Sequence, residues 1–193
     1  WNTGGGLNRG WVDHVRWQPS AEAPLCDALD NCDLTWSTSG TGIPWFGQSG
    51  VSNFGGAAAQ SGNALSATVT GPGLLTFDWK VASSARVNYK GYLNFYAGSS
   101  GDILRDRIFG ETAWAENAIY INPGKQVLRW TFSGGENGYP NCGWLDHVNW
   151  QPSAEVAFCE AVDNCDLVWD RGPTFPAQWY GQSDEYQYGG SAV

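Results

Sequence analysis

Hydrophobic and polar residues alternate along several short stretches of the chain. Between residues 74 and 82, apolar side chains occupy every second position, and polar side chains such as Asp78 and Lys80 lie between them. Residues 127–132 show the same pattern, with Trp130 at the centre of the apolar set. Because successive side chains of a β-strand point to opposite faces of a sheet, each stretch predicts a strand with one buried face. Only residues 20–31 are compatible with a short helical turn.

Strands are predicted at a regular spacing through the middle of the chain. They are expected near residues 33–37, 64–70, 74–82, 91–97, 103–109, 115–121, 125–132 and 143–150. Glycine and proline separate them, for example in Gly71–Pro72–Gly73 and Asn122–Pro123–Gly124. Many short strands with turn signals between them are typical of an all-β fold, so we predict an antiparallel β-sandwich.

The last predicted strand places an acid on its apolar face. Alternation puts one set of residues toward the core, namely Trp144, Asp146, Val148 and Trp150, and the other set outside, namely Leu145, His147 and Asn149. A buried carboxylate needs a cation or several hydrogen bonds to stay ionised. His147 follows this acid directly, but the opposite orientation of the two side chains argues against a catalytic pair.

A long internal repeat organises the chain. Residues 11–36 recur as residues 144–169, 133 positions further on, with 18 of 26 residues identical. The similarity continues from residues 45–49 to residues 179–183. This period exceeds that of a solenoid unit and suits a domain that folds alone. We therefore interpret residues 1–17 as the closing strand of one module, residues 18–150 as a complete module, and residues 151–193 as the opening of the next.

Composition and charge exclude two classes of partner. The chain has 12 Trp and is 15% aromatic but only 15% charged, which predicts a folded protein with an aromatic core. Its net charge of −9 repels phosphate backbones, so nucleic-acid binding is not expected. Apolar runs are far shorter than a membrane span, so membrane insertion is not expected either.

The five cysteines indicate an oxidising environment. Cys26 and Cys32 recur as Cys159 and Cys165, with five residues inside each pair. We expect two disulfides and hence an extracellular or cell-surface location. A zinc site is the alternative, but the chain has no C-x2-C pair and no histidine at ligand spacing. Cys142 has no counterpart in the first copy, so it is either unpaired or bonded to another chain.

Acids close to the first cysteine pair are candidates for a structural calcium site. Asp27 and Asp30 keep their acidity in the second copy, as Glu160 and Asp163. With Asp146 they offer the carboxylate oxygens that Ca²⁺ prefers. The alternative is that these carboxylates accept hydrogen bonds from backbone amides in turns. Apart from calcium, no cofactor is expected.

Aromatic residues outside the predicted core are candidates for ligand binding. Trp45 and Trp114 lie in predicted loops or strand edges, and Tyr92 and Tyr96 lie on the outer face of a strand. Such rings stack on sugars or on protein partners. Catalysis is not expected, because the chain lacks a G-x-S-x-G nucleophile motif and the alternating acids typical of jelly-roll glycosidases.

The order of these motifs resembles a known class of module. The C-x5-C pair is followed by GGAAAQSG (55–62), GPGLLTFDWKV (71–81), VLRWTF (127–132) and GWLDHVNW (143–150). This order resembles the tandem extracellular modules of bacteria that have a concanavalin-like jelly-roll fold, and more distantly MAM domains. MAM-like closing strands carry two acids where this chain has Asp146–His147. The resemblance implies a jelly-roll sandwich with a role in adhesion or assembly.

Two functions of different class are compatible with these observations. In the first, the protein is structural or adhesive, and copies join head to tail into a filament by strand addition, or within a covalent tandem array. The residues expected at this contact are Trp11, Val15 and Trp17 of the closing strand and Trp169 and Trp179 of the opening segment. In the second, the chain is a carbohydrate-binding module of a larger secreted protein. A face lined by exposed aromatic residues favours the second function.

Overall fold

The computed structural model describes most of the chain between residues 21 and 170, together with short segments nearer the ends. The described residues are 13–15, 21–41, 44–49, 56–59, 63–83, 91–134, 141–170, 179–182 and 190–192. Their strands are β1 (Ala21–Ala23), β2 (Ser37–Gly40), β3 (Phe46–Ser49), β4 (Gly56–Ala59), β5 (Asn63–Ala82), β6 (Gly91–Gly98), β7 (Ile103–Phe109), β8 (Ala115–Gly134), β9 (Cys142–Pro152), β10 (Glu155–Val156), β11 (Tyr180–Gln182) and β12 (Gly190–Ala192). Two single-turn helices are α1 (Leu25–Ala28) and α2 (Phe158–Ala161). No helix among the described residues is long and apolar enough to cross a membrane.

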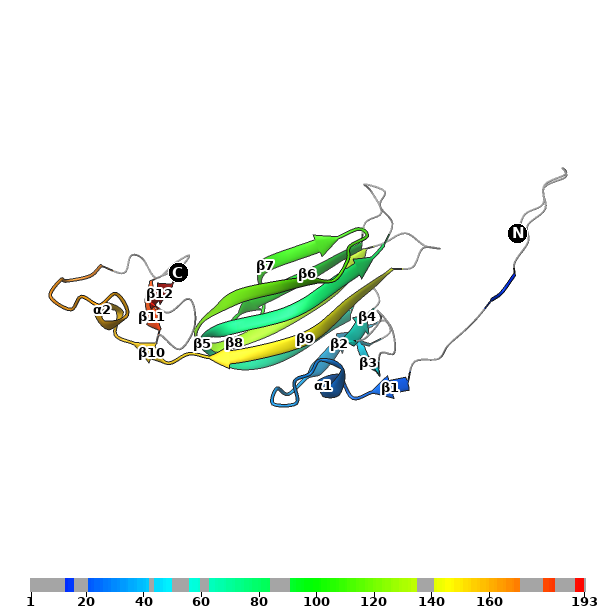
Figure 1. The fold of residues 1–193 in the computed structure, drawn as a ribbon, viewed down its shortest axis with the longest axis horizontal. Helices are drawn as coiled ribbons and strands as arrows, with labels where there is room; N and C mark the ends of the chain where they lie inside the picture. The colour runs from blue at the N-terminus through cyan, green and yellow to red at the C-terminus, as the bar shows by residue number, and fades with distance from the viewer. Residues whose placement is uncertain are drawn as a thin grey trace.

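The two long strands β5 and β8 fold back on themselves and create two layers (Figure 1). They pair with each other along both of their halves, and the register is interrupted between Gly71 and Gly73. Trp130 of β8 pairs with Leu65 of β5. Phe77 lies twelve residues after Leu65 on the same strand, yet the rings of Phe77 and Trp130 are 5.4 Å apart. Twelve extended residues span about 40 Å. The contact therefore shows that the paired strands bend back and that their halves face each other.

The two halves of the β5–β8 pair are flanked by different strands. The first layer contains β2, the first half of β5, the second half of β8, β6 and β7. The second layer contains β1, β3, β4, β9, the second half of β5 and the first half of β8. All of these pairs are antiparallel. The expected fold class, an all-β antiparallel sandwich of the jelly-roll type, is confirmed.

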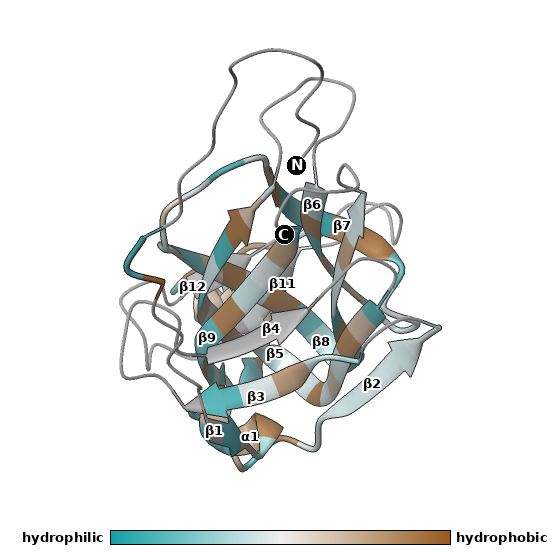
Figure 2. Ribbon diagram, turned by 90° about the vertical axis from the view of Figure 1, so that its right-hand side faces the viewer, coloured by the Kyte–Doolittle hydropathy of each residue, from teal (hydrophilic) through white to brown (hydrophobic). Residues whose placement is uncertain are grey.

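Aromatic side chains fill the space between the layers. Phe77 contacts Phe95 at 5.2 Å, and Phe95 contacts Trp130 at 4.9 Å between ring centroids. Hydrophobic and hydrophilic residues are interspersed along the strands (Figure 2). The two apolar faces predicted by alternation are buried, with Leu75, Phe77, Trp79 and Val81 on β5 and Leu128, Trp130 and Phe132 on β8.

The predicted orientation of the closing strand is wrong in its first half. Leu145 and Val148 are both fully buried, whereas Asp146 is half-buried and His147 is exposed. Thr76 pairs with Asn149 and Asp78 with Asp146, so one residue of β5 faces two residues of β9. This β-bulge, in which His147 has a φ of 48°, shifts the alternation by one position. As a result Asp146 lies outside the core.

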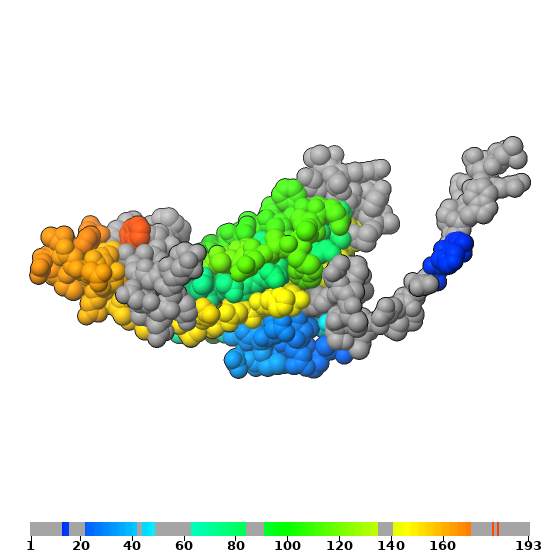
Figure 3. Space-filling view, viewed as in Figure 1, coloured from blue at the N-terminus to red at the C-terminus, as the bar shows by residue number. Residues whose placement is uncertain are grey.

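The described segments between residues 155 and 192 repeat the local structure of the first copy. Glu22 pairs with Gln48 in the first copy, and Glu155 pairs with Gln182 in the second. β11 pairs with β12 in the same register as β3 with β4. The repeated unit lies at one end of the sandwich (Figure 3, orange). The module boundaries at 1–17, 18–150 and 151–193 remain a prediction.

The connection between the sandwich and the second copy is short. β9 ends at Pro152 and β10 begins at Glu155, which leaves two residues between the strands. The amide of Ser153 donates a hydrogen bond to the carbonyl of Pro72 at 2.9 Å, and Ser153 is buried. The connection is therefore attached to the bend of β5.

Candidate functional site

Each copy of the repeat contains a disulfide loop. Cys26 is bonded to Cys32 and Cys159 to Cys165, with Cα atoms 4.5 and 4.6 Å apart. These are the two pairs that the cysteine spacing indicates. Cys142 lies outside both disulfides, half-buried at the start of β9, with its Sγ 3.7 Å from the carbonyl oxygen of Gly143.

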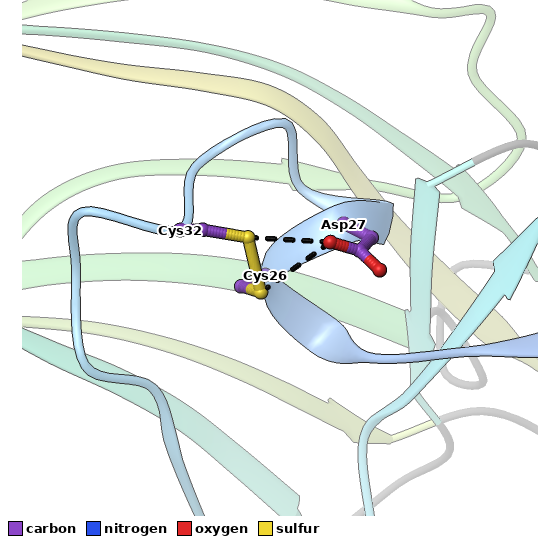
Figure 4. A group of neighbouring side chains, drawn as sticks. All are labelled: Cys26, Asp27 and Cys32. Atoms are coloured by element: carbon purple, nitrogen blue, oxygen red, sulfur yellow. Dashed lines mark hydrogen bonds between the residues drawn. A yellow bond between two sulfur atoms is a disulfide. The ribbon is translucent and has the colours of Figure 1, made fainter.

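Asp27 lies against the first disulfide (Figure 4). One of its carboxylate oxygens is 3.6 Å from Sγ of Cys26 and 3.3 Å from Sγ of Cys32. A disulfide sulfur carries no hydrogen, so these contacts donate nothing to the carboxylate. The structure thus places Asp27 at the disulfide and apart from the close group that Asp30 and Asp146 form with His147.

The disulfide loop docks onto β9 beside the bulge. The amide of Val148 donates to the carbonyl of Leu29 at 2.9 Å, and the side-chain amide of Asn31 donates to the carbonyl of Val148 at 3.1 Å. Leu29 enters the core, while the next residue, Asp30, turns outward with a φ of 56°. Docking therefore brings Asp30 to the outer side of the bulge.

Three carboxylates and one imidazole meet at this bulge. Nδ1 of His147 lies 2.9 Å from Oδ2 of Asp78, and Nε2 lies 3.5 Å from Oδ2 of Asp30. Asp146 pairs with Asp78 across the strands, and its carboxylate accepts a hydrogen bond from the amide of His147 at 2.8 Å. We call Asp30, Asp78, Asp146 and His147 the bulge cluster.

The contacts within the bulge cluster favour protonation of His147. The hydrogen bond to Asp78 raises the pKa of His147 above its usual 6.5, and the charges of Asp146 and Asp30 act in the same direction. Burial raises the pKa of Asp146 above 3.8, and the charges of Asp30 and Asp78 add to that effect. When His147 is protonated, it places a positive charge among the three acids.

Ligand atoms of Asp30, Asp146 and His147 lie within 4.8 Å of one another, a spacing at which they could share a cation. Sequence reasoning identified Asp30 and Asp146 but missed Asp78 and His147. Their contact depends on the register of β5 against β9 and on the bulge, and neither has a local sequence signal. The calcium site therefore remains a prediction, with Asp27 outside this group.

A second surface lies on the outer face of the first layer. Tyr92 and Tyr96 are both half-buried on β6, with Asn94 between them. Arg107 lies over the ring of Tyr92, with Cζ 5.2 Å from the centroid, and Arg129 lies over Tyr96 at 4.7 Å. We call these five residues the tyrosine face.

Two of the predicted stacking residues lie elsewhere. Trp45 is only 2% exposed and belongs to the core cluster, so it is not available to a ligand. The prediction that Trp45 is exposed is wrong, because the indole packs into the buried cluster that also contains Leu29 of the disulfide loop. Trp114 is half-buried and immediately precedes β8, at the end of that strand that belongs to the second layer.

The second copy carries an open apolar pocket where the first copy is closed. The pocket has a volume of about 290 Å³ and is lined by Phe158, Val162, Trp169, Asp170 and Trp179. In the first copy, the counterparts of Val162 and Trp179 are Leu29 and Trp45, which are buried in the core. Trp169 and Trp179 are 40% and 46% exposed.

The residues expected to close such a pocket are only partly described. Trp11 and Trp17 lie outside the described residues, and Val15 is 77% exposed. His14 has a φ of 52° and its amide donates to Asp13 at 2.7 Å, which matches the conformation of Asp146–His147. The local shape of the bulge thus recurs at residues 13–14.

No protein-family model matches the chain, and no curated protein sequence does. Among solved structures, the secreted serine protease VesC from Vibrio cholerae is 15% identical with a TM-score of 0.43; the alignment covers 69% of this chain and 28% of that one. A CBM36-1 domain of a xylanase from the Trinervitermes trinervoides hindgut metagenome is 13% identical with a TM-score of 0.37, covering 62% and 99%. The K1 adhesin domain of Lys-gingipain from Porphyromonas gingivalis is 19% identical with a TM-score of 0.35, covering 70% and 90%. At these TM-scores the likeness says nothing about ligand or activity.

Proposed function

We propose that the protein is a non-catalytic structural or adhesive protein of the cell exterior, in which sandwich modules join end to end. The observation that carries this proposal is the difference between the two copies of the repeat. In the part of the chain that the structure describes, β9 closes the strands and disulfide loop of the first copy, whereas the second copy has an open pocket. The two disulfides support an oxidising location.

The contacts of β9 in the first copy show which groups a strand would have to bind to close the second copy. In the first copy Ala57 of β4 pairs with Leu145 of β9, and Val148 binds the carbonyl of Leu29. The equivalent groups of the second copy are the backbone of β12 and the carbonyl of Val162. A strand that supplies one apolar residue and one backbone donor at these positions would bury Trp169 and Trp179.

Residues 10–17 have a sequence suited to the position that β9 occupies in the first copy. They read GWVDHVRW, against GWLDHVNW at residues 143–150. In this arrangement Val15 of a neighbouring copy takes the position of Val148, and its amide donates to the carbonyl of Val162. Such a contact joins different surfaces of two copies, so it propagates into a filament or an array.

The association of the full chain tests this proposal. We expect copies to associate in sedimentation experiments, and we expect Val15→Asp to weaken the association by placing a charge in the closed core. Ile103→Asp is the matched control, since Ile103 is exposed on β7. A peptide of residues 9–19 should bind and compete. If the chain stays monomeric and the peptide does not bind, end-to-end closure is wrong.

Glycan binding is the second candidate function. The specific observation is the tyrosine face, where the half-buried rings of Tyr92 and Tyr96 lie in a row on the outer side of β6. Aromatic rings of this kind stack on sugar rings. Binding of the chain to immobilised polysaccharides tests this function independently of assembly.

A further inference from the structure

The register of the first layer places two arginines on either side of β6. Arg107 of β7 lies directly opposite Asn94, and Arg129 of β8 lies directly opposite Tyr96. Paired residues of antiparallel strands share one face of the sheet. Both guanidinium groups therefore belong to the outer face, together with the tyrosine rings.

Each arginine is held by contacts within this face. Nε of Arg107 donates to Oδ1 of Asn94 at 2.6 Å while the guanidinium covers Tyr92. Arg129 covers Tyr96 in the same way. Cation–π contacts of this kind restrict a long side chain, so less conformational entropy is lost when a ligand binds.

Neither guanidinium has a carboxylate partner among the described residues. Asp106, the acid next to Arg107, accepts instead from the side-chain amide of Asn117 at 2.6 Å and from the amide of Arg107 at 2.7 Å. Nε of Arg129 is enclosed and has no hydrogen-bond partner in the described part of the chain. In a protein of net charge −9, this face thus keeps two uncompensated cations.

The spacing of these cations selects an extended ligand. Their guanidinium groups lie over Tyr92 and Tyr96, four residues apart on β6, which corresponds to about 13 Å. One small anion cannot reach both positions, whereas a chain with repeated anionic groups can. Ser66 of β5 and Ser37 of β2 lie on the same face, in a row that runs across the strands from Arg129. Their hydroxyl groups suit the hydroxyls of a polysaccharide.

We propose that the tyrosine face binds an acidic polysaccharide, with Arg107 and Arg129 each receiving one anionic group of the extended ligand. The guanidinium fork matches the paired oxygens of a carboxylate and also binds sulfate. This inference rests on the second candidate function and narrows it to one ligand class. The sugar backbone lies along β6, where the edges of the tyrosine rings contact it, while the buried Asn94 holds Arg107 in place.

Binding of the full chain to three polysaccharides tests the inference. Polygalacturonate supplies carboxylates, dextran sulfate supplies sulfates, and dextran is the neutral control. We expect binding to one or both acidic polymers that weakens with added salt, and none to dextran. Arg107→Gln should reduce the affinity about tenfold, and the double variant with Arg129→Gln should reduce it further.

Arg105→Gln is the matched control. Arg105 lies on the same strand as Arg107 and loses the same charge, but its guanidinium donates to the carbonyl of Tyr120. Its affinity should equal that of the unaltered chain. Since Arg129 is half-buried, the exposed Arg107 variant keeps the test valid if Arg129→Gln does not fold.

The possible outcomes distinguish failure of the acidic-ligand inference from failure of glycan binding itself. Equal binding of dextran, unaffected by both arginine variants, overturns the acidic ligand but leaves glycan binding standing. An equal loss in Arg105→Gln also overturns it, because the attraction is then one of general charge. Failure to bind either acidic polymer overturns the inference, and failure to bind any of the immobilised polysaccharides as well removes the second candidate function.

Discussion

Nδ1 of His147 lies 2.9 Å from a carboxylate oxygen of Asp78, although 69 positions separate the two residues in the chain. The contact exists because the β-bulge turns His147 out of the alternation of β9 and toward the outer side of β5. It links the closing strand to the neighbouring strand β5, and the protonation of His147 strengthens that link.

Stability should depend on pH through this histidine. The pKa of His147 is raised in the folded state, so its stabilising contribution is complete below the unfolded value of about 6.5. It is lost as the pH rises through the higher folded value. We expect the melting temperature to exceed that of His147→Gln at about pH 5.5 and the difference to shrink at about pH 8.5. Asp78→Asn should remove the same pH dependence. An equal difference at both pH values would contradict this assignment.

Removal of calcium should lower the melting temperature if the carboxylates of the bulge cluster hold the ion. We expect a chelator to destabilise the chain and Asp146→Asn to abolish the effect, because Asp146 and Asp30 share the candidate position. Asp27→Asn is the matched control, since Asp27 lies at the disulfide. It should keep the sensitivity to chelation. Identical melting curves with and without chelator would rule out a structural calcium ion.

The two disulfides should be visible in the mass of the chain. Reduction should add the mass of four hydrogens, and Cys26 and Cys32 should resist alkylation until a reductant is present. Closure of so short a loop stabilises by about 2 kcal/mol on the loop-entropy estimate. Replacing both cysteines with serine should lower the free energy of unfolding by about that amount, measured in urea. Free alkylation of the unreduced protein would remove the main support for an extracellular location.

Corresponding tryptophans of the two copies should respond differently to truncation. Trp45→Ala removes a buried indole and should destabilise the sandwich by about 3–5 kcal/mol. Trp179→Ala removes an exposed indole and should change the same unfolding transition by less than about 1 kcal/mol. Urea titration of dilute, unassociated protein measures both. Similar losses in the two variants would mean that the second copy is closed within the chain itself.

Residue alternation was sufficient to predict the inner faces of β5 and β8. Phe77 and Trp130 each lie in an unbroken alternating run, so their burial follows from local sequence. The same rule failed at Asp146, because a bulge adds one residue and no local pattern marks it. Trp45 was predicted to be exposed because it lies just outside a strand, whereas its indole packs into the core cluster, which no local pattern shows.

The bulge cluster was beyond local sequence reasoning for a similar reason. Asp30 and Asp146 were identified as candidate ligands from their acidity and their recurrence, but Asp78 was only an outward-facing residue of a strand. Its proximity to His147 is a property of strand register, which a single sequence does not specify for partners so far apart. The repeat itself was fully visible in the sequence, and its two copies show the same backbone pairing.

The short attachment at Ser153 has a consequence for avidity. Only two residues join β9 to β10, and the hydrogen bond from Ser153 to Pro72 ties this connection to the sandwich. Successive modules joined in this way would hold their ligand faces at a constant separation and orientation. Multivalent binding to a polymer then depends on whether its repeat matches that separation, because a stiff connection cannot adjust its span. A ligand of matching period gains strength with every module, and one of mismatched period binds through a single module.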